Sequence, residues 1–313
     1  MAKFAGGSTY NFGLGVSGQT NGFFIPEIYS KKVQIALRKA AVAEAVCNTD
    51  YMGEISQYGD TVNIIKEPQI DVADYTRGLT VASTNLTDQE LVLTIDQAKS
   101  FSFKIDDLEK RFSHVNFQAI ASDNAAYKLR DAMDSNILAA ISAGAGVTTG
   151  MGTTSAPIDI GFASGEVDPL NQMALAAKEL DENNVPEEGR WFVAAPEWYN
   201  VLSNTASKLL TVDFNAGQGS IRNGLVASGL LRGFSMYKSN NLPTNDLSSA
   251  GGSATAPEAL FGHISATSAA SAMNKVETVR DTSTFSDIVR GLMVWGRKVL
   301  RDDSVGKIIY KID

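Results

Sequence analysis

The sequence has little of several residue types on which chemistry depends, and each shortage excludes a class of protein. Its 313 residues include one cysteine, Cys47, and two histidines. A single cysteine cannot form an internal disulfide, which favours a reducing compartment. The two histidines lie far apart in sequence, so they lack the spacing of a zinc-binding helix. A disulfide scaffold and a histidine-pair zinc site are therefore excluded.

Long apolar runs and positive charge are also scarce. No stretch is long and apolar enough to span a bilayer, and the first residues lack the apolar core of a signal peptide. The formal net charge is -8, and no run of Lys and Arg offers a grip on a phosphate backbone. We expect a soluble protein that is made in a cytosol, with no membrane partner and no tight nucleic-acid-binding surface.

Side chains that could act in catalysis have no partners at the required spacing. Neither a Gly-x-Ser-x-Gly elbow nor a Gly-x-x-x-x-Gly-Lys phosphate loop occurs. The pattern places His114 on the polar flank of a helix and His263 at the start of a strand, without the neighbouring groups that a base or metal site needs. Asn85-Leu86-Thr87 matches a glycosylation acceptor, but nothing indicates secretion. We predict no catalytic, cofactor-binding or metal-binding residues and no enzyme activity.

Three acidic pairs are better explained by local structure than by catalysis. Asp106-Asp107 is expected to cap a helix, because adjacent residues on a helix do not face each other. Asp302-Asp303 is expected in a solvated turn. Glu187-Glu188 lies in a turn beside Arg190, where a local ion pair is the modest interpretation.

The glycines Gly13, Gly15 and Gly18 match the dinucleotide-binding pattern by letter only. That pattern requires a preceding strand, a helix that opens at the third glycine and an acidic residue about 20 positions later. Here no strand precedes, the next helix is expected at Pro26, and the later position falls near Arg38. A nucleotide-dependent enzyme is kept only as an alternative from a different class.

The front of the chain, residues 1–24, is rich in Gly, Ser, Thr and Asn, with aromatic residues spread among them. Such a segment cannot build a core and loses much entropy when it is ordered, yet exposed aromatics are unfavourable in water. Both a floppy terminus and an arm that orders against another surface remain open. A helix is expected from Pro26, with apolar positions up to Gly53.

An extended excursion follows the first helix. Apolar and polar residues alternate near residues 61–65, 91–96 and 101–105, which predicts strands, and the stretch between Glu67 and Gln89 is polar. The simplest assembly is a long antiparallel ribbon with a loose tip. An isolated ribbon is marginally stable and has unpaired edges, so it needs a partner surface from its own body or from a neighbouring subunit.

A long helix is predicted from Asp106 to Ala143, where Gly and Pro are absent and apolar residues recur every three, four or seven positions. Gly144 would end it. Such a helix would be roughly 50 Å long and would act as a strut. The alternative is two shorter helices with a break near Ser122-Asp123-Asn124.

A compact unit is expected from residue 168. Asp168 and Pro169 open a helix, and "LDENNVPEEGRWFVAAPEWYNVL", residues 180–202, contains a helix end, a polar turn, a wholly apolar strand and a second helix beginning at Pro196. From Ala259 onward the pattern is mostly strand. Helices and strands do not alternate as in a doubly wound sheet, so the fold class is α+β.

Two of these stretches carry a family resemblance. Residues 180–202 resemble a stretch common in major capsid proteins of tailed bacteriophages, in which a helix, an Asn-Val-Pro turn, an arginine and a strand ending in proline precede a helix. The closing "VETVRDTSTFSDIVRGLMVWGRKVLRDDSVGKIIY" resembles the end of the same proteins. The order of arm, ribbon, long helix and compact unit is similar too. The resemblance covers nearly the whole chain and implies the Hong Kong 97-type fold.

The resemblance also implies a division of the chain. The expected parts are a 1–25 N-terminal arm, a 26–53 helix region of the peripheral domain, a 54–105 extended loop lying over a neighbouring subunit, a 106–167 spine helix with its connection, a 168–258 axial domain, and 259–313 strands shared by both domains. The quoted element at 180–202 would then be scaffold for the axial domain.

Function and partners follow from the same resemblance. The protein would assemble with itself, as pentameric and hexameric capsomers, into an icosahedral shell around double-stranded DNA held without sequence-specific binding. It would assemble in the host cytoplasm and end in the virion, with scaffolding, portal and decoration proteins as further partners. Because no leading scaffold segment is evident, a separate scaffolding protein is expected. Some family members cross-link through lysine and asparagine, but no matching motif assigns this to Lys66.

One rival shares the fold. A bacterial nanocompartment shell protein would have the same architecture, and a cargo-peptide groove beside the N-terminal helix would distinguish it. Such a groove is a feature of the folded structure and cannot be read from the sequence. For the nucleotide-dependent enzyme, removal of residues 1–24 should abolish cofactor binding if the glycine motif is real.

Overall fold

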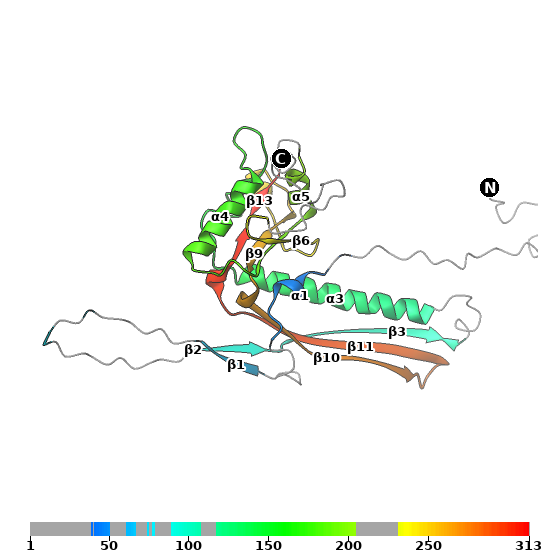
Figure 1. Cartoon of the computed structure of the whole chain (residues 1–313). Coiled ribbons are helices and arrows are strands. Elements are labelled where there is room, and N and C mark those ends of the chain that lie inside the picture. The colour runs from blue at the N-terminus through cyan, green and yellow to red at the C-terminus, as the bar shows by residue number, and fades with distance from the viewer. Residues whose placement is uncertain are drawn as a thin grey trace, which may run out of the picture.

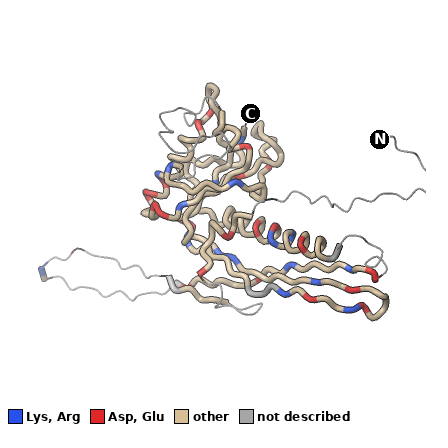
Figure 2. Tube along the Cα trace, turned by 45° about the vertical axis from the view of Figure 1, so that its right-hand side comes forward, with Lys and Arg blue, Asp and Glu red and all other residues tan. Residues whose placement is uncertain are grey.

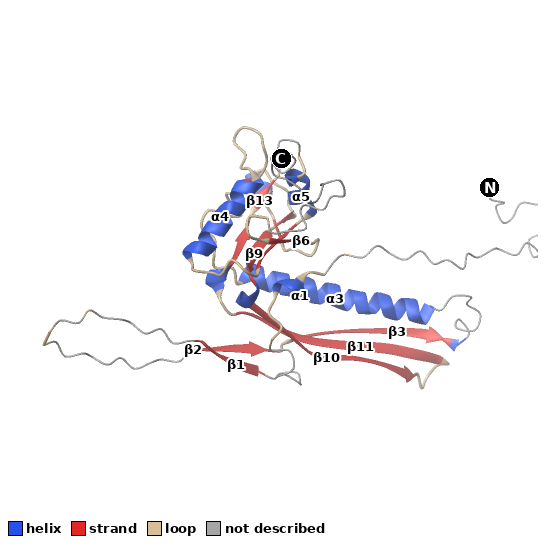
Figure 3. Ribbon diagram, in the orientation of Figure 1, coloured by secondary structure: helices blue, strands red, loops and turns tan. Residues whose placement is uncertain are grey.

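The computed structural model describes residues 39, 41–50, 61–66, 74, 77–78, 89–107, 117–204 and 231–312. They form two parts, shown in Figure 1 and by element type in Figure 3. One is a rounded lobe that contains a four-stranded sheet and two helices. The other is an elongated layer, in which a long helix lies along a three-stranded sheet. Helices and mainly antiparallel sheets are mixed without regular alternation, as the predicted α+β class requires.

The elongated layer pairs helix and sheet face to face. It consists of α3 (Phe117–Ala143), β3 (Gln97–Asp106), β10 (Thr267–Arg280) and β11 (Ser286–Val299). The strands are antiparallel in the order β10-β11-β3, so β10 and β11 form a long hairpin and β3 lines its inner edge. Trp295, which is fully buried, ties the sheet to the helix through Nε1, which donates to Asn136 Oδ1 over 3.1 Å.

Helix α3 is unbroken within its described range. It passes through Ser122-Asp123-Asn124 without interruption, so the alternative of two shorter helices is wrong there. The helix ends at Ala143 as predicted, where Gly144 N donates to Ala140 O over 3.0 Å. Within the described part of the predicted apolar stripe, Ile137 is buried, whereas Ala126 is exposed.

Asp106 belongs to a strand, and the residue after it, Asp107, is helical, so the cap at Asp106 stays a prediction. Asp106 is the last residue of β3 and stands opposite Ser286 of β11. The strand continues past Ile105 because β11 supplies a pairing partner that local periodicity does not reveal. His114 and the rest of residues 108–116 lie outside the described residues.

The lobe is organised around one sheet. Its strands are β5 (Arg190–Ala194), β6 (Ser235–Lys238), β9 (Ala259–His263) and β12 (Val305–Ile308), in the order β12-β9-β5-β6. β5 and β6 run parallel, and the other pairs are antiparallel. The helices are α4 (Pro169–Glu182) and α5 (Pro196–Leu202).

Smaller elements complete the lobe and its connections. The paired short strands are β4 (Ile158–Asp159) with β13 (Tyr310–Lys311), and β7 (Thr244–Asn245) with β8 (Ala256–Pro257). The 3-10 helices are η3 (Ser248–Ala250), η4 (Ile264–Ala266) and η5 (Asp302–Ser304). The chain passes from β9 through η4 into the long hairpin and returns through η5 to β12, so its last strands contribute to both parts.

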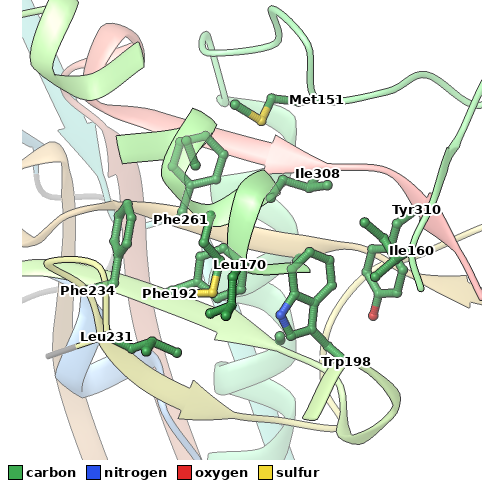
Figure 4. Close-up of a cluster of buried hydrophobic side chains, with 14 of the residues drawn as sticks. Met151, Ile160, Leu170, Phe192, Trp198, Leu231, Phe234, Phe261, Ile308 and Tyr310 are labelled. Carbon is green, nitrogen blue, oxygen red and sulfur yellow. The ribbon is translucent and has the colours of Figure 1, made fainter. Parts of the chain in front are cut away.

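Strand β5 is apolar throughout because it separates two cores. Phe192 faces the lobe core of Figure 4, where its ring lies 5.5 Å from that of Trp198. Trp191 and Val193 point the other way, into a core shared with Ile137 of α3. Alternate residues of a strand face opposite sides, so both sides of this strand are covered. The predicted doubly buried strand is thereby explained.

The start of α4 follows the prediction closely. Asp168 Oδ1 accepts a hydrogen bond from Leu170 N over 2.8 Å, and Pro169 occupies the first turn. Asp168 is thus the expected N-cap. Pro169 stands in the first turn, where the backbone N–H has no partner within the helix, so a proline loses no hydrogen bond there. Met173 and Leu180 of the predicted stripe are fully buried.

The ribbon is made of two strands rather than three. β1 (Thr61–Lys66) and β2 (Gln89–Thr94) pair antiparallel and project from the elongated layer (Figure 1). We expected residues 101–105 to belong to this excursion as well, but they form part of β3 and pair with β11 instead. Alternation identifies a strand, but it does not identify the partner of that strand.

The ribbon base crosses the sheet at a glycine. A Cβ atom at Gly296 would lie 2.5 Å from Thr94 O, so only glycine allows this approach. Leu93 is buried against Val294, with Val62 packed beside them. The ribbon is thus anchored on the sheet face that α3 does not cover.

The segment that leads into the described fold is short. α1 (Ala43–Val46) spans four residues and is followed by Cys47 in an extended conformation, after which Asn48 N donates to Thr267 O over 2.8 Å. The predicted continuation of a helix to Gly53 is therefore wrong, because the chain turns to pair with β10. Residues 1–38, including the predicted arm, lie outside the described residues.

Candidate functional site

His263 has a structural role in the fold. It is the last residue of β9 rather than the start of a strand, which corrects the prediction. Its Nδ1 lies 2.7 Å from Ser265 Oγ, and its Nε2 lies 2.7 Å from the carbonyl oxygen of Glu188. Both ring nitrogens are therefore engaged in fixing the turn before β5.

Arg190 fastens the turn quoted above, but its partner is not one of the predicted glutamates. Its Nη2 donates to Asp181 Oδ1 over 2.6 Å and to Val185 O over 2.5 Å, and its Nε donates to Pro186 O over 2.9 Å. The side chain is buried, with 3% exposed. The interpretation of Glu187-Glu188 as the ion-pair partner is wrong, since the helix end at Asp181 folds back toward the arginine.

The other acidic pairs form no reactive cluster. Asp107 is in an ion pair with Arg280, and Asp302 and Asp303 are exposed in η5, in agreement with the predicted solvated turn. In the described segments, no group of three or more His, Cys, Asp and Glu is placed to hold a metal ion. Nor is any helix of those segments long and apolar enough to cross a bilayer.

A cavity of about 330 Å³ beside α1 and α3 is lined by both charged and apolar side chains, among them Lys39, Arg130 and Asp131. Its buried carboxylate, Asp134, has structural partners: Oδ1 accepts hydrogen bonds from Val42 N and Ala43 N, each over 2.7 Å. This group therefore fixes the start of α1, and its Oδ2 also accepts a hydrogen bond from Asn241 Nδ2 over 2.9 Å.

The same environment suppresses the chemistry of the single cysteine. Burial, reinforced by the negative charge of Asp134, raises the pKa of the Cys47 thiol to about 12. A thiol with such a pKa is neutral at physiological pH and is a poor nucleophile.

Several sequence candidates lie outside the described residues. These are Gly13, Gly15 and Gly18 of the dinucleotide-like pattern and Asn85-Leu86-Thr87. The backbone of Lys66 is the end of β1, but its side chain is not among those described.

Exposed apolar side chains gather on the elongated layer and the ribbon. Among the described large apolar residues, those most open to solvent are Phe285 at 82%, Val276 at 59%, Val92 at 40%, Val279 and Ile264 at 39%, Ile120 at 38% and Leu292 at 37%. Of these, only Ile264 lies outside the ribbon, α3 and the β10–β11 hairpin. The ribbon and the elongated layer thus carry most of the exposed apolar surface of the described residues.

Charges of both signs accompany these apolar residues, as Figure 2 shows along the elongated layer. On the hairpin, Arg290 pairs with Glu277 across the two strands, and Arg280 pairs with Asp107 and Asp287. Exposed pairs of this kind stabilise little but prevent a uniform field. The hairpin offers mixed charge and apolar patches, not the basic stripe of a nucleic-acid-binding protein.

A comparison with protein families shows which family this chain belongs to. The model of a family described as phage capsid protein matches residues 88–308. The chain belongs to the phage capsid protein family. A search among curated proteins finds no match for the sequence.

Solved structures agree with this phage capsid assignment. The chain is similar to a structure from Mycobacterium phage Che8, with 26% identity, a TM-score of 0.74, and coverage of 91% of this chain and 97% of that one. It is also similar to the capsid of cyanophage P-SCSP1u, with 21% identity, a TM-score of 0.71, and coverage of 95% and 96%. A third similar structure, from the bacteriophage PhiM1 mature capsid, has 15% identity, a TM-score of 0.65, and coverage of 95% and 94%.

The fold is therefore the Hong Kong 97-type capsid fold, and the protein is a structural protein of a phage capsid. Among the described residues, the exposed apolar surfaces of the ribbon and the hairpin are the candidate functional elements. Sequence reasoning located the ribbon strands but missed the exposed phenylalanine of the hairpin turn. The only available signal was an aromatic residue, Phe285, placed among Asp, Thr and Ser between two alternating strands.

Proposed function

We propose that this phage capsid protein is the major capsid protein of a tailed bacteriophage, and that it self-assembles into the icosahedral head shell that encloses double-stranded DNA. The observation that carries the proposal is the shape of the subunit. A ribbon and a long hairpin extend beyond the cores that could cover them, and both expose apolar residues. Identical neighbours supply the cover that one chain lacks.

The parts of the subunit fit distinct tasks in such a shell. The lobe would be the axial domain and would meet its copies around the centres of pentameric and hexameric capsomers. The elongated layer would be the peripheral domain, with α3 as its spine. The ribbon would lie over a neighbouring subunit, where the exposed Val92 would be buried.

Charge supports a container rather than a DNA-binding protein. A formal net charge of -8 weakens any grip on the packaged phosphate backbone, so DNA would be held without sequence-specific contacts. Scaffolding, portal and decoration proteins would be the further partners. The protein would assemble in the host cytoplasm, remain in the virion and perform no catalysis.

Electron microscopy of the purified full chain tests the proposal. We expect uniform polyhedral shells, or capsomer rings and curved sheets, above a threshold protein concentration. Particles that remain monomers or small closed oligomers at every concentration tested, with and without a crowding agent, would refute it.

A further inference from the structure

Phe285 is the most exposed of the described large apolar side chains, with 82% of its surface open to solvent. It lies in the turn that joins β10 to β11, at the end of the elongated layer farthest from the lobe (Figure 1). The 27 described residues of α3 span about 40 Å along that layer. The lobe of the same chain is therefore too distant to cover the ring.

The backbone around Phe285 is held in place on both sides. Asp281 N donates to Ser286 O over 3.0 Å, and Asp107 N donates to Phe285 O over 3.0 Å. The Asp281 carboxylate accepts hydrogen bonds from Ser283 N over 2.9 Å and from Thr284 Oγ1 over 2.7 Å. A turn fixed in this way presents the ring with little further loss of backbone entropy on contact, as an anchor residue should.

The charges beside the ring have partners within the chain. Lys104 pairs with Asp281, and its hydrogen bond is the main reason that the pKa of Asp281 lies well below its usual range. Arg280 pairs with Asp107 and Asp287. Because these charges are paired within each chain, two such hairpins can approach each other without strong repulsion between like charges. The contact that Phe285 offers to a partner is therefore apolar.

The hairpin also contains a surface that suits a phenyl ring. Val276 is 59% exposed and stands opposite Gly291. The Phe101 ring occupies the space above Gly291, since a Cβ atom on this glycine would lie 2.3 Å from the ring. Val276 and Phe101 thus lie on the same face of the sheet as Trp295, which is the face toward α3, and they form one apolar patch on that side. Val279 is three residues further along the strand and so faces the opposite side.

We propose that Phe285 is an assembly anchor that packs against the Val276–Phe101 patch of the same hairpin in a second copy of the chain. The proposal rests on the proposed function, because it requires that copies meet in a shell. It names the contact: an apolar, self-complementary junction between hairpin ends, with little dependence on salt.

Matched substitutions in the full chain test the anchor. Phe285→Ala should raise the protein concentration needed for assembly by roughly tenfold to a hundredfold, and Val276→Thr by about tenfold, as expected for the loss of buried apolar surface. Val279→Thr, on the same strand but the other face, is the control and should assemble like the wild type. Assembly is followed by light scattering and electron microscopy, and the melting temperature of each unassembled protein is measured in parallel.

Cross-linking reports the geometry independently. Chains with Phe285→Cys are co-assembled with tagged chains carrying Val276→Cys, and the mixture is oxidised. Cys47 is buried and does not compete. We expect disulfide-linked pairs of one tagged and one untagged chain in the shells and none in the unassembled mixture.

The failures of the two proposals are distinguishable. A wild-type chain that never assembles refutes the proposed function and removes the basis of the anchor. Wild-type shells with unchanged assembly of Phe285→Ala and no cross-link refute the anchor alone. A lower melting temperature of unassembled Phe285→Ala also refutes it, because the ring would then be covered by its own chain.

Discussion

At the scale of single residues, the turn at 183–190 shows how a polar sequence can serve packing rather than chemistry. Asn184 adopts a left-handed backbone conformation with φ 57°, and Val185 N donates to Leu180 O over 3.0 Å, which together close the end of α4. The carbonyl groups of Val185 and Pro186 then point at Arg190, which is buried. We therefore expect the hydrogen bonds from Arg190 to the backbone to stabilise the turn more than its ion pair with Asp181 does.

Replacing Arg190 should therefore cost more than replacing its acidic partner. We expect Arg190→Ala to lower the free energy of unfolding by about 2–4 kcal/mol, because two carbonyl groups lose their donor. Asp181 is 57% exposed, so Asp181→Asn should cost below about 1 kcal/mol. Denaturant unfolding of both unassembled variants measures the difference. Equal losses would mean that the ion pair, not the backbone contacts, holds the turn.

Cys47 gives a prediction with a definite pH window. Burial raises the pKa of the folded thiol to about 12 from its ordinary value of 9.0, so it stays protonated and neutral where the unfolded thiol ionises. The contribution of this group to stability is thus complete below pH 9 and is lost as the pH rises from 9 toward 12. At pH 8.5, a thiol reagent should modify the unfolded protein readily and the native protein at least about a hundredfold more slowly. Rapid modification of native protein would show that the α1 segment opens easily.

Single-residue assignments from sequence succeeded where the partner is local and failed where it is not. Asp168 caps α4 as predicted, because the cap bond reaches only two residues along the chain. The predicted partner of Arg190 was wrong: spacing brought Glu187 and Glu188 near, whereas the fold selects Asp181 across the turn. His263 ends a strand instead of starting one, because the chain turns into the 3-10 helix η4 at Ile264.

At the scale of elements, strand periodicity is visible in the sequence and strand partners are not. The alternation of β3 was assigned to the ribbon, but its ten residues pair with β11, some 190 positions later. The same long-range pairing extended β3 to Asp106, a residue that the sequence pattern had placed at the start of a helix. By contrast, α3 was predicted in its described range because a helix satisfies its backbone locally.

Two glycines of β11 differ in what surrounds them, which gives a matched pair of substitutions. A methyl group at Gly296 would meet Thr94 O at 2.5 Å, and this backbone atom cannot move without displacing the ribbon base. At Gly291 it would meet the Phe101 ring, a half-buried side chain that can move aside. We expect Gly296→Ala to cost about 3 kcal/mol or more and Gly291→Ala about 1–2 kcal/mol of unfolding free energy. If Gly291→Ala costs as much as Gly296→Ala, the proposed role of the ribbon crossing is wrong.

At the scale of the whole molecule, the lobe and the elongated layer differ in how completely they cover their apolar residues. The lobe core contains Phe192, Trp198, Phe234 and Phe261, all fully buried (Figure 4). The hairpin instead leaves Val276 and Phe285 largely in water. Among the described residues, the lobe therefore buries its large aromatic side chains, whereas the hairpin has apolar surface left for neighbours.

The most direct test of this account is a cryo-electron microscopy map of particles assembled from the full chain. We predict a closed icosahedral lattice in which the β1–β2 ribbon of each copy lies against a neighbouring copy and the hairpin ends of adjacent copies meet. A map in which ribbon and hairpin fold back onto their own chain, or particles without a lattice of identical neighbours, would contradict the account.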